Sequence, residues 1–173
     1  MSLKPPVSDR DHMQGNKNAS IELLEYGDYQ CPYCGEAYPI VKAIQKKMGA
    51  KVKFVFRNFP LAEAHPDAVH AAISAEAAAA QGKFWEMHDA LYEHQRDLGD
   101  PALMKLAKQV GLDMSQFEKD FDKRETQDRV EADFESGVRS GVNGTPAFFI
   151  NGKKYNDSWD EETLLGYLES LTG

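Results

Sequence analysis

The residues best suited to chemistry in this sequence are two cysteines in the tetrapeptide Cys31-Pro32-Tyr33-Cys34. They are the only 2 cysteines among 173 residues. Two thiols separated by two residues can form and open a disulfide with each other. In a reducing compartment such a lone pair is more often catalytic than structural. The spacing therefore indicates thiol–disulfide exchange.

The elements on either side place this pair at the start of a helix. A strand-like run from Ile21 to Tyr26 precedes it, and a helix-like run from Glu36 to Met48 follows it. Unpaired N–H groups and the helix dipole favour a thiolate at a helix N-terminus, so we expect a Cys31 pKa between about 3.5 and about 7. Cys31 would attack a substrate disulfide, and Cys34, one turn further along, would resolve the mixed disulfide.

Two other roles for the cysteine pair are weaker. A disulfide that closes a four-residue loop stabilises a fold by only about 2 kcal/mol, against about 4.7 kcal/mol for a 100-residue loop. A structural zinc site needs four ligands, and no histidine has a spacing that would complete one with the cysteines. The histidines are His12, His65, His70, His88 and His94. We expect no metal and no organic cofactor, because the cysteines are themselves the redox group.

Composition and charge narrow the class of partner. The chain is 42% hydrophobic and 28% charged, with a net charge of −8, which argues against nucleic acid or an anionic membrane as the main partner. No apolar run approaches the ~18 residues of a membrane span, so we expect no membrane insertion. The segment Met1 to Pro6 lacks the apolar core of a signal peptide. The sequence thus favours a cytoplasmic protein, or a periplasmic one if a signal peptide has been removed.

The rest of the pattern alternates between strands and helices. Val52, Phe54 and Phe56 recur with strand periodicity and predict a second strand, and a third is expected over residues 147–150. Asn151-Gly152 is a typical two-residue hairpin turn into a fourth strand. About 80 residues between these strands have helical spacing. This order predicts an α/β sandwich with a helical insertion.

Taken together, these features resemble the DsbA-like branch of the thioredoxin superfamily over residues 15–172. The features that carry the resemblance are Cys31-Pro32-Tyr33-Cys34 after the first strand, Gly144-Thr145-Pro146 before the hairpin, and the helical block between them. The resemblance implies an α/β thioredoxin-like fold and a protein-disulfide oxidoreductase. It also implies an N-terminal arm (1–18), a thioredoxin-like domain (19–62 and 142–173) and an inserted helical domain (63–141).

The resemblance also implies further site residues. Thr145-Pro146 matches the family's cis-proline, a loop that faces the cysteines and pairs its backbone with a bound peptide as an added strand. Pro32, Tyr33, Thr145 and Pro146 would therefore bind substrate. The expected partners are protein or peptide thiols and disulfides, with a redox recycling partner. Pro39, five residues after Cys34, matches the proline that kinks the active-site helix.

Glu25 is a candidate for proton transfer. It lies six residues before Cys31, where the family has an acidic residue beneath the active site. Period-two spacing puts it on the face of Ile21 and Leu23, where burial would raise its pKa and let it relay a proton to Cys34. The alternative is a strand-end carboxylate that reaches solvent.

Tyr33 separates this chain from the strongly oxidising members of the branch, which carry histidine at that position. Tyrosine cannot pair with the Cys31 thiolate as an imidazolium does, so we expect a less oxidising protein. Cys-Pro-Tyr-Cys is also the glutaredoxin sequence, which leaves a glutathione-dependent activity open. The stretch Phe56 to Pro60 is similar to that of small bacterial DsbA-like proteins, some of which are fused to sodium/proton antiporters. A peptide-binding, chaperone or transporter-regulatory module is the alternative from another class.

Several aromatic residues have helical or strand spacing and are expected in the core. His88 lies on the same face as Phe84 and Leu91 and is predicted to be a core histidine rather than a catalytic one. Tyr29, Tyr38 and Trp85 are likewise expected to pack inside, with a peptide groove as the alternative.

Overall fold

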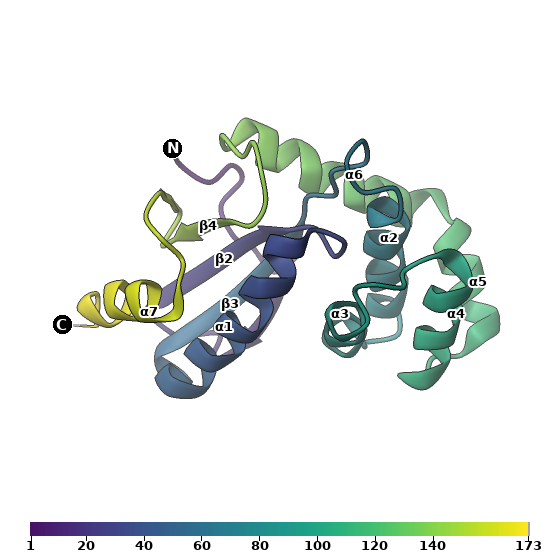
Figure 1. The fold of residues 1–173 in the computed structure, drawn as a ribbon, viewed down its shortest axis with the longest axis horizontal. Helices are drawn as coiled ribbons and strands as arrows, with labels where there is room; N and C mark the ends of the chain where they lie inside the picture. Colours follow the sequence, from purple (N-terminus) through teal and green to yellow (C-terminus); the bar gives the residue numbers. More distant parts are fainter. Residues whose placement is uncertain (173) are drawn as a thin grey trace.

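The computed structural model of the protein describes residues 1–172 and contains a five-stranded sheet beside a block of helices (Figure 1). The strands are β1 (His12–Gly15), β2 (Ile21–Gly27), β3 (Val52–Asn58), β4 (Ala147–Ile150) and β5 (Lys153–Tyr155). The helices are α1 (Pro32–Met48), α2 (Ala68–Ala79), α3 (Phe84–Glu93), α4 (Asp100–Gln109), α5 (Met114–Asp122), α6 (Arg124–Arg139) and α7 (Glu161–Ser170), with a 3₁₀ turn over Gly49–Lys51. This is the predicted thioredoxin-like α/β architecture.

The sheet has the strand order β1-β3-β2-β4-β5. Its central strands β2 and β3 are parallel, which requires a crossover, and α1 supplies it. β4 and β5 continue the sheet antiparallel, joined by the expected turn at Asn151 (φ 50°) and Gly152 (φ 82°). Both residues have positive φ, as a type I′ hairpin turn requires.

The edge strand β1 was not predicted. Residues 1–18 were expected to form only an arm, but His12–Gly15 pairs antiparallel with β3, with His12 opposite Phe56. Four residues with one apolar side chain, Met13, are too few to show a strand period. The strand is held by backbone pairing with β3, by packing of Met13 against the core and by the contact of His12 with Glu76 at 3.0 Å. Earlier in the same segment Leu3 is buried, and the amide of Lys4 donates a hydrogen bond to Ser140 Oγ at 2.8 Å. The segment is therefore part of the packed structure.

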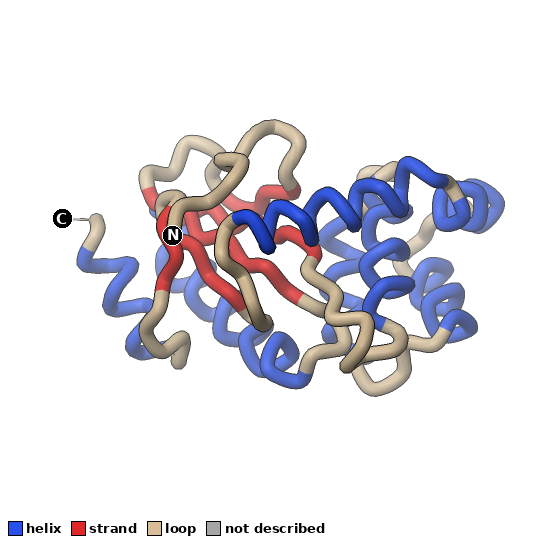
Figure 2. The backbone as a smooth tube through the Cα atoms, turned by 90° about the horizontal axis from the view of Figure 1, so that it is seen from above, coloured by secondary structure: helices blue, strands red, loops and turns tan. Residues whose placement is uncertain are grey.

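The two faces of the sheet are covered by different helices. On one face, Leu23 and Phe54 pack in a common core with Ile44 of α1 and Leu168 of α7. On the other face, the core is formed by Leu24, Tyr26, Val55, Phe59 and Phe149, with Phe134 of α6 packed against it. Seen from above, α6 extends from the sheet to the helical block (Figure 2).

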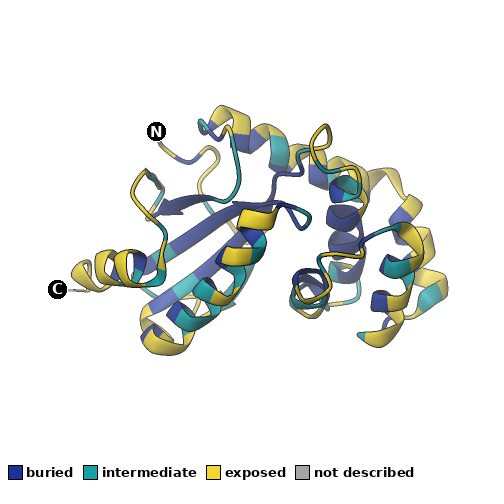
Figure 3. Cartoon of the chain, in the orientation of Figure 1, coloured by how far each residue is buried: buried dark blue, intermediate teal, exposed yellow. Residues whose placement is uncertain are grey.

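Helix α2 lies at the centre of the helical block. It packs against α3, α4, α5 and α6, and 9 of its 12 residues are buried. Figure 3 shows it as the mostly buried helix among more exposed neighbours. Seven of its residues are alanines. Small side chains allow neighbouring helices to approach closely, so this composition suits a central position.

Gly137 of α6 gives a test of how tightly this helix packs on the sheet. A Cβ there would lie 2.6 Å from Phe59 Cδ1 and 3.1 Å from Tyr26 Cε1. Both rings are buried, so we expect Gly137→Ala to lower the free energy of unfolding by about 1–3 kcal/mol through overpacking. Urea unfolding followed by circular dichroism measures the change.

Gly166 of α7 is the matched control, because a Cβ there meets no atom within 4 Å. Gly166→Ala should raise the free energy of unfolding by about 0.5–1 kcal/mol, the ordinary gain in helix propensity. If both substitutions stabilised the protein equally, the close packing of α6 on the sheet would be wrong.

Candidate functional site

The two cysteines lie at the N-terminus of α1. Cys31 is the N-cap residue, with extended backbone angles (φ −71°, ψ 123°), and Pro32 occupies the first helical turn. The carbonyl of Cys31 accepts the amide of Gly35 at 3.0 Å, which begins the helix. Both cysteines are free thiols, and α1 continues through Pro39 to Met48. The local sequence thus places one thiol at the helix end and the other within the first turn.

The environment lowers the pKa of Cys31 to about 5. The main cause is a hydrogen bond with the side chain of Cys34, which outweighs the effect of burial. Thr145 and two backbone groups lower the pKa further. The value lies within the range expected from the sequence. Cys31 is only 4% exposed, and its two neighbours Pro32 and Tyr33 are exposed, Tyr33 by 62%.

Cys34 has the opposite environment. It is fully buried, and burial raises its thiol pKa well above the ordinary value; the hydrogen bond with Cys31 and the nearby charge of Glu25 act in the same direction. Its Sγ accepts the amide of Asp28 at 3.4 Å. One thiol is therefore ionised at neutral pH, while the second retains its proton.

Glu25 is buried beneath the cysteines. Only 3% of it is exposed, and it lies on the face of Ile21 and Leu23 expected from the strand periodicity. Its pKa is raised to about 8, chiefly by burial and further by the negative charge of Cys31. Its Oε2 atom is buried without a hydrogen-bond partner. This geometry excludes the solvent-exposed alternative and gives a carboxyl group that can exchange a proton near neutral pH.

The Thr145–Pro146 loop meets the cysteines from the other side. The peptide bond between these residues is cis. The carbonyl oxygen of Thr145 lies 3.6 Å from Cys31 Sγ, although the two residues are 114 positions apart. A pocket of about 350 Å³ lies beside the loop and is lined by Thr145, Pro146, Tyr155 and Trp159, among others. The structure therefore brings Cys31 and the loop together.

Gln95 is a site residue that the sequence did not reveal. It follows α3 in the helical block, and its Nε2 donates hydrogen bonds to the carbonyl oxygens of Cys31 at 2.7 Å and Tyr29 at 3.0 Å. A Cβ on Gly35 would collide with its amide group. No motif marks Gln95, because a side chain 64 residues away reaches the loop only through tertiary packing.

Of the aromatic residues expected inside, Tyr29 lies in the core, whereas Tyr38 and Trp85 are only partly buried against it. Tyr29 is 1% exposed, and its hydroxyl lies 2.9 Å from Nδ1 of His88. His88 is buried among aromatic rings, and burial lowers its pKa well below the ordinary value. Its expected position in the core is confirmed. Within residues 1–172, no group of three or more His, Cys, Asp or Glu residues could hold a metal ion.

Known proteins with a similar sequence or structure show the family to which this chain belongs. The family model described as thioredoxin matches residues 8–170. The chain belongs to the thioredoxin family. A thioredoxin-like oxidoreductase from Silicibacter pomeroyi has a similar structure (TM-score 0.85, 25% identity, covering 95% of this chain and 94% of that one). Oxidised BdbD from Bacillus subtilis is also similar (TM-score 0.82, 26% identity, covering 94% of each chain). These neighbours place the chain in the DsbA-like branch of this family.

The similar sequences of known proteins are named as sodium/proton antiporters, not as oxidoreductases. A Na(+)/H(+) antiporter NhaA 3 from Salinispora tropica is 40% identical over 165 residues, which are 95% of this chain and 25% of that protein. NhaA 1 from Mycobacterium sp. (strain KMS) is 39% identical over 170 residues, which are 97% of this chain and 28% of that protein. The chain thus spans about a quarter of the length of these relatives. No helix within residues 1–172 has the length and hydrophobicity to cross a bilayer.

The low pKa of Cys31 can be measured directly. Alkylation of the reduced protein by iodoacetamide should increase with pH around a midpoint of about 5. Cys34→Ala removes the hydrogen bond that stabilises the thiolate and should raise the midpoint by about 1–2 pH units. Cys34→Ser keeps a hydroxyl donor, so its midpoint should shift less. A wild-type midpoint near 8.5, the value of an ordinary cysteine, would contradict this site.

Proposed function

We propose that the protein is a thiol–disulfide oxidoreductase that exchanges disulfides with protein or peptide thiols through Cys31 and Cys34. The observation that carries this proposal is the difference between the two thiols. The pKa of Cys31 is lowered to about 5, whereas that of Cys34 is raised well above its ordinary value. Only the thiolate is a nucleophile, so this difference supports an attacking role for Cys31 and a resolving role for Cys34.

The reaction runs in two exchanges. The Cys31 thiolate attacks one sulfur of a substrate disulfide, the substrate S–S bond breaks, and one substrate thiolate leaves. Cys34 then loses its proton and attacks Cys31 Sγ, which releases the second substrate thiolate. The substrate gains two electrons, and the two cysteines are oxidised to a disulfide. The reverse sequence oxidises a substrate dithiol.

Glu25 would accept the proton of Cys34 in the second exchange. In the reduced protein the charge of Cys31 helps to raise the pKa of Glu25 to about 8. Once Cys31 is bonded to substrate this charge is gone, and the Glu25 pKa falls. The carboxylate form therefore becomes more populated at the stage when a base is needed.

Substrate would bind across Pro32, Tyr33, Thr145 and Pro146. Pro32 and Tyr33 are exposed beside the attacking sulfur. The Thr145 carbonyl, 3.6 Å from Cys31 Sγ, would pair with an extended peptide. In this proposal residues 63–141 form an inserted helical domain, which supports the same site through Gln95.

The direction of exchange depends on the compartment and on the recycling partner. Because Tyr33 cannot become cationic, we expect a protein less oxidising than relatives with histidine at that position. In a reducing compartment the net flow would be reductive or isomerising. In an oxidising compartment it would be oxidative.

The relatives favour a second candidate, a redox or regulatory module that works beside a transporter. Two antiporters share 39–40% identity with this chain, which covers about a quarter of their length. A module of this kind could act by binding alone. If Cys31→Ser abolishes the effect of the module on its transporter, the module acts by catalysis. If the effect is fully retained without this thiol, the module acts by binding.

Disulfide exchange by the two cysteines is tested by mixing the reduced protein with substrates that carry intact disulfides, such as insulin or a disulfide-bonded peptide. Cys31→Ser should lose exchange activity by at least about 100-fold, because the nucleophile is absent. Cys34→Ser should instead accumulate a mixed disulfide through Cys31, visible by mass spectrometry. A parallel assay with a glutathione mixed disulfide separates dithiol exchange from glutaredoxin-like activity. Undiminished exchange in Cys31→Ser would refute the proposal.

The role of Glu25 is tested by Glu25→Gln. Near pH 8, where the Glu25 carboxylate is populated, its loss should slow release of the mixed disulfide by at least about tenfold, since a positioned base typically contributes 10²–10⁴-fold. Near pH 5, where Glu25 of the wild type is protonated, the rates of the variant and the wild type should converge. Stopped-flow fluorescence of the resolving step gives the rates. Glu22→Gln, on the same strand but paired with Lys53 at 3.6 Å, is the matched control and should react as wild type. Rates independent of Glu25 across this range would rule out the relay.

A further inference from the structure

A second pocket lies on the side of the molecule covered by α6. It has a volume of about 200 Å³ and is lined by residues from the N-terminal segment, β3 and α6. None of its lining residues belongs to the thiol site. We propose that this pocket binds a phosphate-type oxyanion, either as a free ion or as part of a small phosphate monoester.

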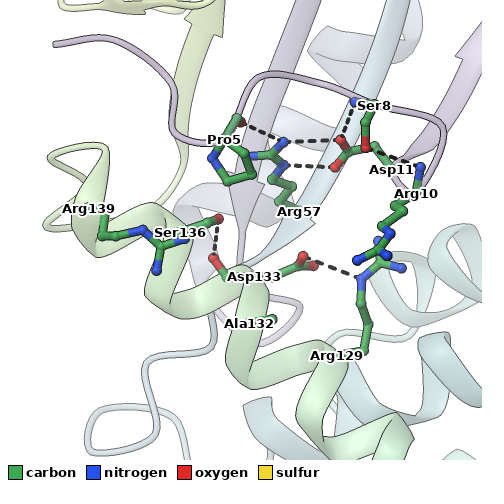
Figure 4. A pocket seen from close by; sticks show the side chains of 10 residues that line it. All are labelled: Pro5, Ser8, Arg10, Asp11, Arg57, Arg129, Ala132, Asp133, Ser136 and Arg139. Carbon is green, nitrogen blue, oxygen red and sulfur yellow. Dashed lines mark hydrogen bonds and ion pairs between the residues drawn. The ribbon is translucent and has the colours of Figure 1, made fainter.

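Arginine is concentrated here. Four of the six arginines in the chain line the pocket, although the chain has a net charge of −8. They are Arg10, Arg57, Arg129 and Arg139. In Figure 4 the side chains of Arg10 and Arg129 point toward one another from the N-terminal segment and from α6. Like charges that converge in a concave site repel one another unless an anion lies between them.

Arg57 forms the floor of the pocket and is held rigidly. It is 3% exposed, and its guanidinium donates to both carboxylate oxygens of Asp11, at 2.8 and 3.0 Å. It also donates to the hydroxyl of Tyr26 and to the carbonyl of Pro5, each at 3.0 Å. A guanidinium has five N–H donors, so one N–H of Nη1 remains for a ligand.

The remaining arginines are less committed. Within residues 1–172, the side chains of Arg10 and Arg139 form no hydrogen bond or ion pair, and both residues are exposed. Arg129 reaches Asp133 Oδ1 at a long distance of 3.4 Å. The other oxygen of Asp133 accepts the backbone and side-chain nitrogens of Asn58 at 2.9 and 3.0 Å.

The charge in the pocket is therefore positive. Asp11 and Asp133 are the acidic residues that line it, and each is engaged by an arginine. Four arginines against two aspartates leave a surplus of two positive charges, which matches a phosphate dianion. The planar fork of arginine suits the tetrahedral oxygens of phosphate, which can accept two parallel hydrogen bonds from one side chain.

The size of the pocket limits the ligand. Its volume of about 200 Å³ compares with about 30 Å³ per water molecule in liquid water. A phosphate group with a substituent of a few atoms would fill it. A ligand here would contact both the N-terminal segment and α6, so its binding should also hold these two segments together.

The test is a titration of the full chain with inorganic phosphate at low ionic strength, by isothermal calorimetry. We expect saturable binding of one phosphate per chain. The double variant Arg10→Gln/Arg139→Gln should weaken binding by at least about tenfold, because two charge-assisted contacts are lost. Neither side chain has a partner in the described residues, so the fold should not change; circular dichroism checks this.

Arg124→Gln is the matched control. Arg124 lies on the same helix outside the pocket and pairs with Asp128 at 3.0 Å, so its loss should change the affinity less than twofold. A parallel titration with glycerol 3-phosphate distinguishes the two sources: tighter binding than phosphate indicates a monoester, and weaker binding indicates the free ion. Absence of saturable binding of either probe, or equal losses in the control and the double variant, would overturn the proposal.

The arginine side chains give a second readout that needs no variant. In ¹⁵N spectra, phosphate should shift the Nε–H signals of the four pocket arginines and leave those of Arg96 and Arg124 unchanged. Shifts confined to Arg96 or Arg124 would place the anion elsewhere and contradict the proposal.

Discussion

The site depends on the unequal environments of two sulfur atoms in one helical turn. Cys34 is sealed in the core and retains its proton, and its hydrogen bond with Cys31 stabilises the Cys31 thiolate. A helix end alone favours an anion but does not distinguish two neighbouring thiols. Burial distinguishes them, because it disfavours the charged form of Cys34 much more than that of Cys31. The remaining parts of the site maintain this difference.

Three separate regions of the chain maintain the difference between the environments of Cys31 and Cys34. β2 places Glu25 in the dry interior beneath the cysteines, and the loop at Thr145 closes over Cys31 from the other side. The helical block contributes Gln95, which holds the carbonyl of Cys31 at the start of α1. This contact gives the block a structural role at the site in addition to any role in substrate binding. Displacement of the block would therefore alter the position of Cys31 Sγ.

The two faces of the sheet have different chemistry. The face beneath α1 carries the thiols and a buried acid, and the face beneath α6 carries a network of arginine, aspartate and asparagine side chains. In that network Arg57 ties the N-terminal segment to the sheet through Asp11, and Asn58 links β3 to Asp133 of α6. Because Asn58 also donates to Glu76 of α2, the network joins the sheet to the helical block. Buried polar groups of this kind are stable only when their partners are in place.

The sequence by itself determined the fold class, the face of Glu25 and the hairpin at Asn151-Gly152, and it predicted the low pKa of Cys31. Each of these follows from spacing within one or two neighbouring elements. Strand β1, the contact of Gln95 with Cys31 and the arginine pocket were decided only by the tertiary structure. They join residues far apart in the chain, such as Arg10, Arg57 and Arg129, whose spacing follows no helical or strand period. Local periodicity reports which face of an element is buried, but it carries no information on which distant side chain meets that face.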